Sequence, residues 1–250
     1  MRNPTPTRDQ IRAELLKARS GAALPVLLLV ALALGALGQV GAVYGETQLA
    51  AAVAETSHRV VTLAGSATLF ATLFGALLVT SEFRSGAIGR SVLHAPGRGA
   101  VVGAKLLVAT VSGLLFGVVA VLGALAVGAA ALGARGASLV LDGESAWRVL
   151  AVLAVCTLAG PFGAAVGFVV RNQLAAVVGL LLWGTVGQLM VLGQLPELGR
   201  FLPDGAQQSV LGDRLTFPDA LSAPHGLLLL VAWGAATALL ARRLFVRRDV

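Results

Sequence analysis

The hydrophobic pattern of this chain is dominated by six long stretches that contain no Asp, Glu, Lys or Arg. They cover residues 21–45, 60–81, 106–134, 149–170, 172–196 and 220–241. As a helix, even the shortest of them would rise about 33 Å at about 1.5 Å per residue, enough to cross a hydrocarbon core of about 30 Å. The pattern therefore predicts six membrane-spanning helices, at 22–43, 60–81, 106–130, 149–170, 173–195 and 221–241.

The composition agrees with a chain that lies mostly in lipid. Of its 250 residues, 57% are hydrophobic and 12% are charged. Soluble domains usually have about 25% charged and about 45–50% apolar residues. So few charged side chains cannot cover a water-exposed surface. We therefore expect an all-α polytopic membrane protein in which residues 1–250 form a single transmembrane domain.

Basic residues are distributed unevenly between the two sides that these spans define. Fourteen lie on the side of the termini: Arg2, Arg8, Arg12, Lys17, Arg19, Arg84, Arg90, Arg98, Lys105, Arg171, Arg242, Arg243, Arg247 and Arg248. Five lie on the other side: Arg59, Arg135, Arg148, Arg200 and Arg214. Because Lys and Arg are retained in cytoplasmic loops, the bias predicts that both termini lie in the cytoplasm. The chain is rich in Ala, Gly, Val and Arg and poor in Lys, which suggests a bacterial genome, so we expect a multi-pass protein of the bacterial inner (plasma) membrane.

The segment before the first span is polar and forms a separate element. Thr7 and Gln10 match a capping box, which predicts a helix over 7–20. Leu15 and Ala18 share one face of this helix and arginines occupy another, so we expect it to lie along the inner membrane surface. The alternative is a frayed basic leader that only sets topology. A cleaved signal peptide fits poorly, because the polar segment before the apolar run is too long.

Two further patterns concern packing and the outer side. Gly113 and Gly117, and likewise Gly163 and Gly167, are four residues apart, a spacing that lets helices approach closely in lipid. We expect these glycines to pack tightly within the bundle. The segment 196–219 is an extracellular loop, too polar to span the membrane and too long for a simple turn. A partly helical cap is expected there.

The sequence offers little to catalysis. Ionisable side chains at membrane depth mark most membrane enzymes and ion-coupled carriers, but within the six stretches only His225 is of this kind. His58, His94 and His225 have no ligand spacing, so we expect no metal site. The segment 97–106 superficially resembles a phosphate loop, yet a residue separates its last glycine from Lys105 and no Ser or Thr follows. We therefore expect no catalytic residue and no cofactor on this chain.

The loop between the second and third predicted spans, 82–105, carries the most specific pattern. It reads Thr80-Ser-Glu-Phe-Arg-Ser-Gly-Ala-Ile, then Leu93-His-Ala-Pro-Gly-Arg98, and ends on Ala104-Lys105. This resembles the first cytoplasmic loop of ABC-transporter permeases of the type-2, exporter class. The family more often has Thr in place of Ala87 and a basic residue in place of Gly97.

Further matches to this family lie near both ends. The run Glu14-Leu-Leu-Lys17-Ala-Arg19-Ser20 is similar to the family's Glu-x-x-Lys-Leu-Arg-Ser, with Ala18 in place of Leu. Arg171-Asn172 before the fifth span and an Arg-Arg-Asp tail are also usual there. The resemblance covers nearly the whole chain. Arginine is abundant while lysine occurs only twice, which favours a GC-rich bacterial genome such as an actinobacterial one.

This resemblance implies a permease subunit that forms half of an export path. A separate ATPase subunit, in two copies, would bind ATP and Mg, so this chain would not be an enzyme. Because the basic residues bracket apolar runs, we expect them to face anionic lipid headgroups rather than nucleic acid. A second permease chain, identical or related, would complete a dimer. A cytoplasmic coupling helix from Thr80 to about Val92 would dock on the ATPase. The coupling residues would be Glu82, Phe83, Arg84, Gly86, Ile88, Pro96 and Arg98.

Three polar side chains are candidates for the lining of the path. Thr68 and Thr72 lie one turn apart in the second predicted span, and Gln188 lies in the fifth. The alternative for the threonines is a hydrogen bond from each hydroxyl to its own helix backbone. Two other functions stay open on the sequence: a non-transporting membrane scaffold or assembly protein, and an ion-driven secondary carrier, which the lack of charge at depth disfavours.

Overall fold

The computed structural model describes residues 7–95, 97–212 and 220–247 of the chain. Within these ranges the regular elements are helices and no strand occurs. Five of the helices are long and apolar enough to cross a membrane. They are Ala23–Gly45, Leu49–Arg84, Arg98–Ala134, Gly143–Val170 and Ala223–Arg247. This architecture agrees with the predicted all-α polytopic membrane protein.

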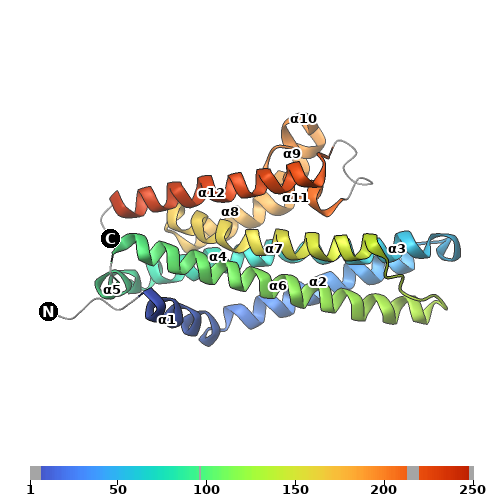
Figure 1. Ribbon diagram of the computed structural model, residues 1–250, viewed down its shortest axis with the longest axis horizontal. Coiled ribbons are helices and arrows are strands. Elements are labelled where there is room, and N and C mark those ends of the chain that lie inside the picture. The colour runs from blue at the N-terminus through green and yellow to red at the C-terminus, as the bar shows by residue number, and fades with distance from the viewer. Residues whose placement is uncertain (1–6, 96, 213–219, 248–250) are drawn as a thin grey trace.

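The elements follow one another as short and long helices (Figure 1). In chain order they are α1 (Thr7–Ser20), α2 (Ala23–Gly45), α3 (Leu49–Leu63), η1 (Ala64–Ser66), α4 (Ala67–Arg84), α5 (Ala87–His94), α6 (Arg98–Ala134), α7 (Gly143–Val170), α8 (Gln173–Leu182), η2 (Trp183–Gly187), α9 (Gln188–Gln194), α10 (Pro196–Gly199), α11 (Pro203–Leu211) and α12 (Ala223–Arg247). The helix predicted at 7–20 is present as α1.

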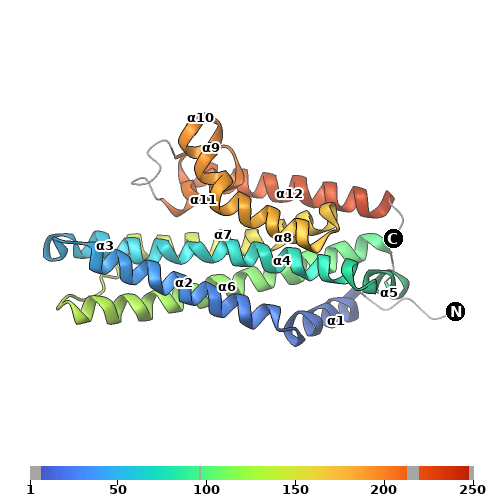
Figure 2. The same cartoon turned by 180° about the vertical axis from the view of Figure 1, so that it is seen from behind.

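The long helices lie roughly parallel in three layers. In Figure 1, α4 and α7 form the middle layer, with α12 and α8 above them and α2 and α6 below. The short helices α1 and α5 lie at the same end as the C-terminal end of α12, and Figure 2 shows the same grouping from behind. This end contains most of the basic residues counted above. Helix α3 and the connection between α6 and α7 lie at the opposite end.

The stretch predicted as the fifth span, 173–195, is helical but not regular. The helices α8 and α9 are joined by the π-helical turn η2, in which the backbone N–H of Gln188 donates to the carbonyl of Trp183. Gly187 leaves room beside the Trp183 ring, since a Cβ there would lie 2.9 Å from it. In a π turn the backbone hydrogen bond joins residues five positions apart instead of four, so the regular α-helical geometry is interrupted. The interruption leaves this stretch outside the five long apolar helices.

Glycines allow α4, α6 and α7 to touch backbone to backbone. A Cβ on Gly163 or Gly160 of α7 would collide with the carbonyl oxygen of Thr72 in α4 or Ala109 in α6, respectively. On α6, Gly113 and Gly117 face Cys156 and its neighbours in α7 in the same way. The prediction that the four-residue glycine pairs pack within the bundle is therefore confirmed.

The connection between α4 and α6 differs from the single helix predicted from Thr80 to about Val92. Helix α4 runs on to Arg84 and stops, and α5 begins only after Gly86, which has φ +68°. A residue without a Cβ adopts this left-handed conformation at little cost. The glycine therefore divides the predicted helix into the end of α4 and the separate helix α5.

Polar contacts fasten the opposite end of the bundle. The carboxylate of Asp142 accepts a hydrogen bond from the backbone N–H of Ser145 at 2.8 Å, which caps α7, and lies 2.9 Å from the ring Nε2 of His58 in α3. These two contacts lower the pKa of Asp142 to about 2. Arg135 donates to the carbonyl oxygens of Val43 and Glu46 at the end of α2. The connection between α6 and α7 is thereby tied to α3 and to the end of α2.

The predicted outer cap, 196–219, contains two helices in its described part. The helical path breaks at Leu195, where φ is −137° and ψ is 61°, and α10 and α11 follow. Residues 213–219 of that prediction lie outside the described residues. Helix α11 packs against α12, and Gly226 of α12 permits this because a Cβ there would lie 2.7 Å from the carbonyl oxygen of Ala206.

The glycine contacts predict a pair of opposite mutational effects. Gly163→Ala should destabilise the bundle by about 1–3 kcal/mol, because the added methyl group overpacks a backbone contact. Gly133→Ala in α6 should be neutral or mildly stabilising, because nothing lies within 4 Å of that Cβ and alanine favours helix. Thermal unfolding in detergent checks both. Equal melting temperatures for the two variants would contradict the backbone contact.

Candidate functional site

A buried lysine is the centre of the polar structure at the basic end. The ammonium group of Lys105, near the start of α6, is fully buried. It lies 2.7 Å from an oxygen of Glu14 in α1 and 2.9 Å from an oxygen of Glu82 at the end of α4. Its third hydrogen bond, at 3.2 Å, goes to the carbonyl oxygen of Leu78. An ammonium group has three donors, so this one is fully satisfied by three partners from two other helices.

A second lysine balances the charge. Lys17 of α1 lies 2.7 Å from the other oxygen of Glu14 and 3.0 Å from the same Glu82 oxygen that contacts Lys105. Burial opposes its charge, but the hydrogen bonds to Glu14 and Glu82 outweigh this and raise the pKa of Lys17. Two lysines and two glutamates thus form a neutral group, which we term the ionic cluster (Glu14, Lys17, Glu82 and Lys105).

The ionic cluster extends to α5 through one hydroxyl. Ser91 of α5 donates to the second oxygen of Glu82 at 3.1 Å and accepts a hydrogen bond from Lys17 at 3.3 Å. Ile88 of the same helix is buried, with 3% of its surface exposed. Helix α5 is therefore attached to the bundle by one polar and one apolar anchor, and both lie on its inner side.

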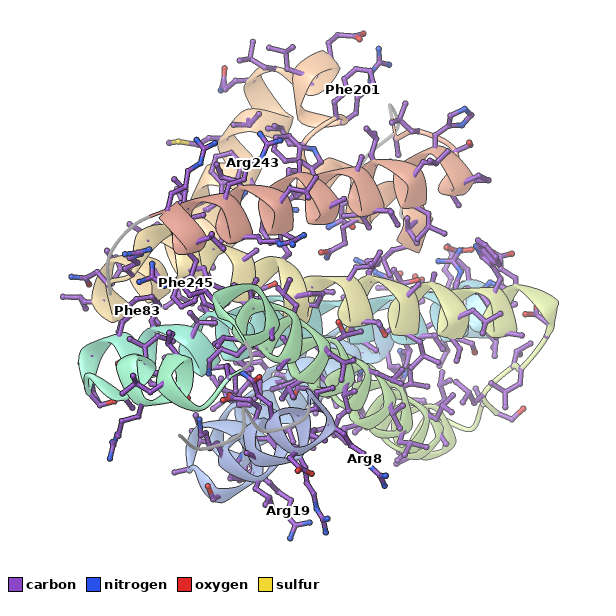
Figure 3. All side chains as sticks on the ribbon, turned by 60° about the vertical axis from the view of Figure 1, so that its left-hand side comes forward. Arg8, Arg19, Phe83, Phe201, Arg243 and Phe245 are labelled. Atoms are coloured by element: carbon purple, nitrogen blue, oxygen red, sulfur yellow. The ribbon has the colours of Figure 1, made fainter. Side chains whose placement is uncertain are left out.

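The inward face of α1 is polar, which the sequence pattern did not predict. Gln10 and Glu14 are buried against the bundle together with Ala18, whereas Leu15 and Leu16 are 39% and 59% exposed. Figure 3 shows Arg8 and Arg19 of α1 extending away from the bundle. The helix thus contacts the protein through the ionic cluster and leaves leucines and arginines on its outside.

An aromatic cluster (Phe83, Phe168 and Phe245) joins α4, α7 and α12 at the same end. Ring centroids of its members lie 5.0 to 6.4 Å apart, and Phe83 and Phe245 are adjacent in Figure 3. The guanidinium of Arg171, just after α7, lies 5.3 Å from the centre of the Phe83 ring and 5.9 Å from that of Phe245. Cation–π contacts of this kind stabilise by about 0.5–2 kcal/mol. They hold the last turns of α12 against the bundle.

The seven predicted coupling residues do not form one exposed surface. Glu82 belongs to the ionic cluster and Phe83 to the aromatic cluster, while Ile88 is in the core. Arg84 is exposed, and Gly86 forms the break before α5. Pro96 lies outside the described residues.

The remaining coupling residue, Arg98, is an anchor between helices. It begins α6, and its guanidinium donates to the carbonyl oxygen of Val246 in α12 at 3.2 Å. Together with the aromatic cluster this contact fixes the end of α12. Four of the predicted residues therefore hold the loop against the bundle: Glu82, Phe83, Ile88 and Arg98. The outer face of α5 is formed by other side chains, of which Leu93 is 82% exposed.

The three candidates for a path line one cavity. Thr68, Thr72 and Gln188 contribute to the walls of a cavity of about 330 Å³ between α4, α7, η2, α11 and α12. The hydroxyl of Thr68 donates to the backbone carbonyl oxygen of Gly65 at 2.8 Å, and the hydroxyl of Thr72 donates to the backbone carbonyl oxygen of Thr68 at 2.9 Å. The alternative of local hydrogen bonding is thus confirmed for both threonines. Their role in a path stays a prediction.

The ionic cluster gives a direct mutational test. Lys105→Met should destabilise the protein by about 3–5 kcal/mol, because it leaves a net negative charge buried between Glu14 and Glu82. Adding Glu14→Gln should restore part of the loss, since Lys17 and Glu82 then remain as a neutral pair. Thermal unfolding of the three proteins in the same detergent measures this coupling. A double variant less stable than Lys105→Met would refute the assignment of the pair.

The described residues thus present two candidate functional regions. One is the outer face of α5, whose inner face contacts the ionic cluster, and the other is the cavity lined by Thr68, Thr72 and Gln188. No group of three or more His, Cys, Asp or Glu side chains gathers as a metal site in the ranges that the structure describes. Comparison of the chain with protein-family models and with curated proteins finds no match. The function is therefore inferred from the sequence pattern and the geometry.

Proposed function

We propose that this chain is the permease subunit of an ATP-driven ABC exporter of the type-2 class, coupled to a separate ATPase. The observation that carries the proposal is the position of α5. It lies between α4 and α6 at the basic end of the bundle, it is hinged by Gly86, and its inner face is bound to the ionic cluster. A helix held in this way can transmit a displacement at its outer face to the helices behind it.

The route of transmission follows from the contacts. A push on α5 acts on Glu82 through Ser91, and Glu82 shares Lys105 with Glu14. Three helices, α1, α4 and α6, must then move as one unit, because separating them would leave buried charges without their partners in a medium of low dielectric constant. In this proposal Glu82, Phe83, Ile88 and Arg98 hold the coupling helix, whereas the docking contacts come from exposed residues such as Arg84 and Leu93.

The proposed topology has six passes. Beyond the five long helices, α8, η2 and α9 run from Gln173 to Gln194 between α7 and α12 and supply the remaining pass. At about 1.5 Å per residue they are long enough to reach across a hydrocarbon core. Both termini and α5 would then face the cytoplasm, with α1 lying on the inner surface of the bacterial plasma membrane.

The proposed complex contains two permease chains and two ATPase copies. Large apolar side chains are exposed along α2 and α12, for example Leu37 at 69% and Leu228 at 69%. Such surfaces suit lipid or a second permease chain, but not water. The cavity with Thr68, Thr72 and Gln188 would belong to the path of each half.

The topology can be tested by labelling. In a Cys156→Ala background, Leu93→Cys should react with a membrane-impermeant maleimide only after cells are broken, since α5 is cytoplasmic in the proposal. Arg59→Cys in α3, which is also exposed but belongs to a helix at the opposite end, should react in intact cells. Labelling of position 93 in intact cells would overturn the orientation.

Coupling can be tested with the ATPase that co-purifies from native membranes. Arg84→Glu should weaken its binding by about tenfold or more, because a lost charge-assisted contact costs about 1.5–3 kcal/mol. Leu93→Asp should weaken it by a similar factor, because it places an unpaired carboxylate in an apolar contact. Both variants should insert and melt normally, since neither side chain is part of the ionic cluster. The control is Arg59→Glu, whose charge change lies at the other end.

The readout is the amount of ATPase recovered and its ATP hydrolysis in liposomes. Recovery of an ATP-hydrolysing subunit with the unmodified chain, and its loss with the two variants, is the expected result. A chain that retains other membrane proteins but no ATPase would favour a scaffold. Unchanged recovery in both variants would remove α5 as the docking element.

A further inference from the structure

An unpaired acid lies in the cavity. Asp204, in the first turn of α11, is one of the residues that line it, and among the described lining residues it is the only ionisable one. Its oxygen Oδ2 is buried and has no hydrogen-bond partner among the described residues. Burial raises the pKa of Asp204 to about 6, although a hydrogen bond from Trp183 acts in the opposite direction. Asp204 is therefore charged at neutral pH, and among the described residues only a hydrogen bond from Trp183, and no cation, stabilises that charge.

The charged side chains nearby that the structure describes have other partners. Arg200, four residues before Asp204, pairs with Glu197 and stacks over the ring of Phe201. His225 at the start of α12 is hydrogen-bonded to Ser222. A buried carboxylate without a cation is costly, and a bound cation would offset that cost. The electrostatics of the cavity therefore favour a positively charged ligand.

Aromatic and amide side chains complete the walls. Trp183 and Trp233 both line the cavity, and the indole N–H of Trp233 donates to the carbonyl oxygen of Phe201 at 2.9 Å, which fixes its ring. Tryptophan faces attract organic cations. Gln188, Gln207 and Gln208 add hydrogen-bonding groups. The other walls are mostly apolar: Leu63, Leu69, Val155, Leu158, Phe162, Leu180, Leu211 and Leu230.

Close contacts position α11, which forms one wall of the cavity. Helix α11 packs closely against both α12 and η1. Gly226 of α12 lies so near Ala206 of α11 that a Cβ would not fit, and the Leu211 side chain of α11 fills the space beside Gly65 of η1. Ser209 of α11 accepts the backbone N–H of Leu221 at 3.0 Å. A volume of about 330 Å³ falls within the range of small-molecule sites, which is about 300–1,000 Å³.

We propose that this cavity binds an amphipathic organic cation, whose ammonium group pairs with Asp204 while its apolar part lies against the two tryptophans. The carboxylate supplies the countercharge, the indoles supply cation–π and apolar contact, and the leucines exclude water. The carboxylate of Asp204 would repel an anion, and a neutral molecule would leave its charge without a countercharge. Binding is a property of this chain and does not depend on the proposed export function.

The test uses two probes of equal shape. Benzyltrimethylammonium carries a permanent charge, and neopentylbenzene has carbon in place of its nitrogen. Binding to the purified chain in lipid nanodiscs is followed by isothermal titration calorimetry and by tryptophan fluorescence. The cation should bind saturably, and Asp204→Asn should weaken it at least tenfold. The neutral probe should bind the wild type and Asp204→Asn alike.

Controls separate a ligand site from a structural role. Glu55→Gln in α3 removes an exposed acid that does not line the cavity and should leave cation binding unchanged. Asp204→Asn should melt at the same temperature as the wild type or higher, because it removes a buried charge. Since the cation does not titrate, weaker binding at pH 5 than at pH 8 would report protonation of Asp204. Equal affinity of Asp204→Asn and wild type for the cation, or equal affinity of the two probes for the wild type, would overturn the proposal.

Discussion

The pairing of Lys105 with two glutamates is the constraint on which the basic end of this protein depends. A fully buried ammonium group is tolerated only where carboxylates neutralise it and its three donors are satisfied. Glu14 comes from α1 and Glu82 from the end of α4, so the charge balance can be met only when α1, α4 and α6 are assembled. Ser91 adds α5 to the same network. The short helices α1 and α5 are thereby joined to the long helices by ionic contacts in addition to the apolar packing of Ala18 and Ile88.

The middle of the bundle is held by a different force. Within lipid, apolar side chains gain little by leaving one apolar environment for another, so helices associate through close packing. Gly160 and Gly163 give α7 direct backbone contact with α6 and α4. The three helices consequently form a tight unit. By contrast, the chain from α8 to α12 contains a π turn and the wall of a cavity, and α12 is mostly exposed. In the proposed exporter, the tight unit would receive the displacement of α5, and the looser side would border the path.

The coupling loop shows how a motif can be informative while its residues serve unexpected roles. Glu82 and Phe83 were expected to contact a partner, but the structure places them in the ionic and aromatic clusters. Their charge and aromaticity are explained by contacts within the chain. Gly86 explains why the loop helix is separate from α4, since its positive φ ends one helix and begins the next. In the proposed exporter, the docking surface would be formed by the side chains on the outer side of α5.

By itself the sequence determined the all-α class, the helix at 7–20 and the glycine contacts within the bundle, and five of the six spans that it predicts coincide with helices long and apolar enough to cross a membrane. These follow from local properties: hydropathy over about 20 residues, capping residues and four-residue spacing. Only the tertiary structure decided that Lys105 pairs with Glu14, 91 positions away, that the inward face of α1 is polar, and that Asp204 lies beside Thr68 and Trp233 in one cavity. The physical reason is that hydropathy and periodicity are properties of neighbouring residues, whereas the partner of a buried charge is fixed by how distant helices pack.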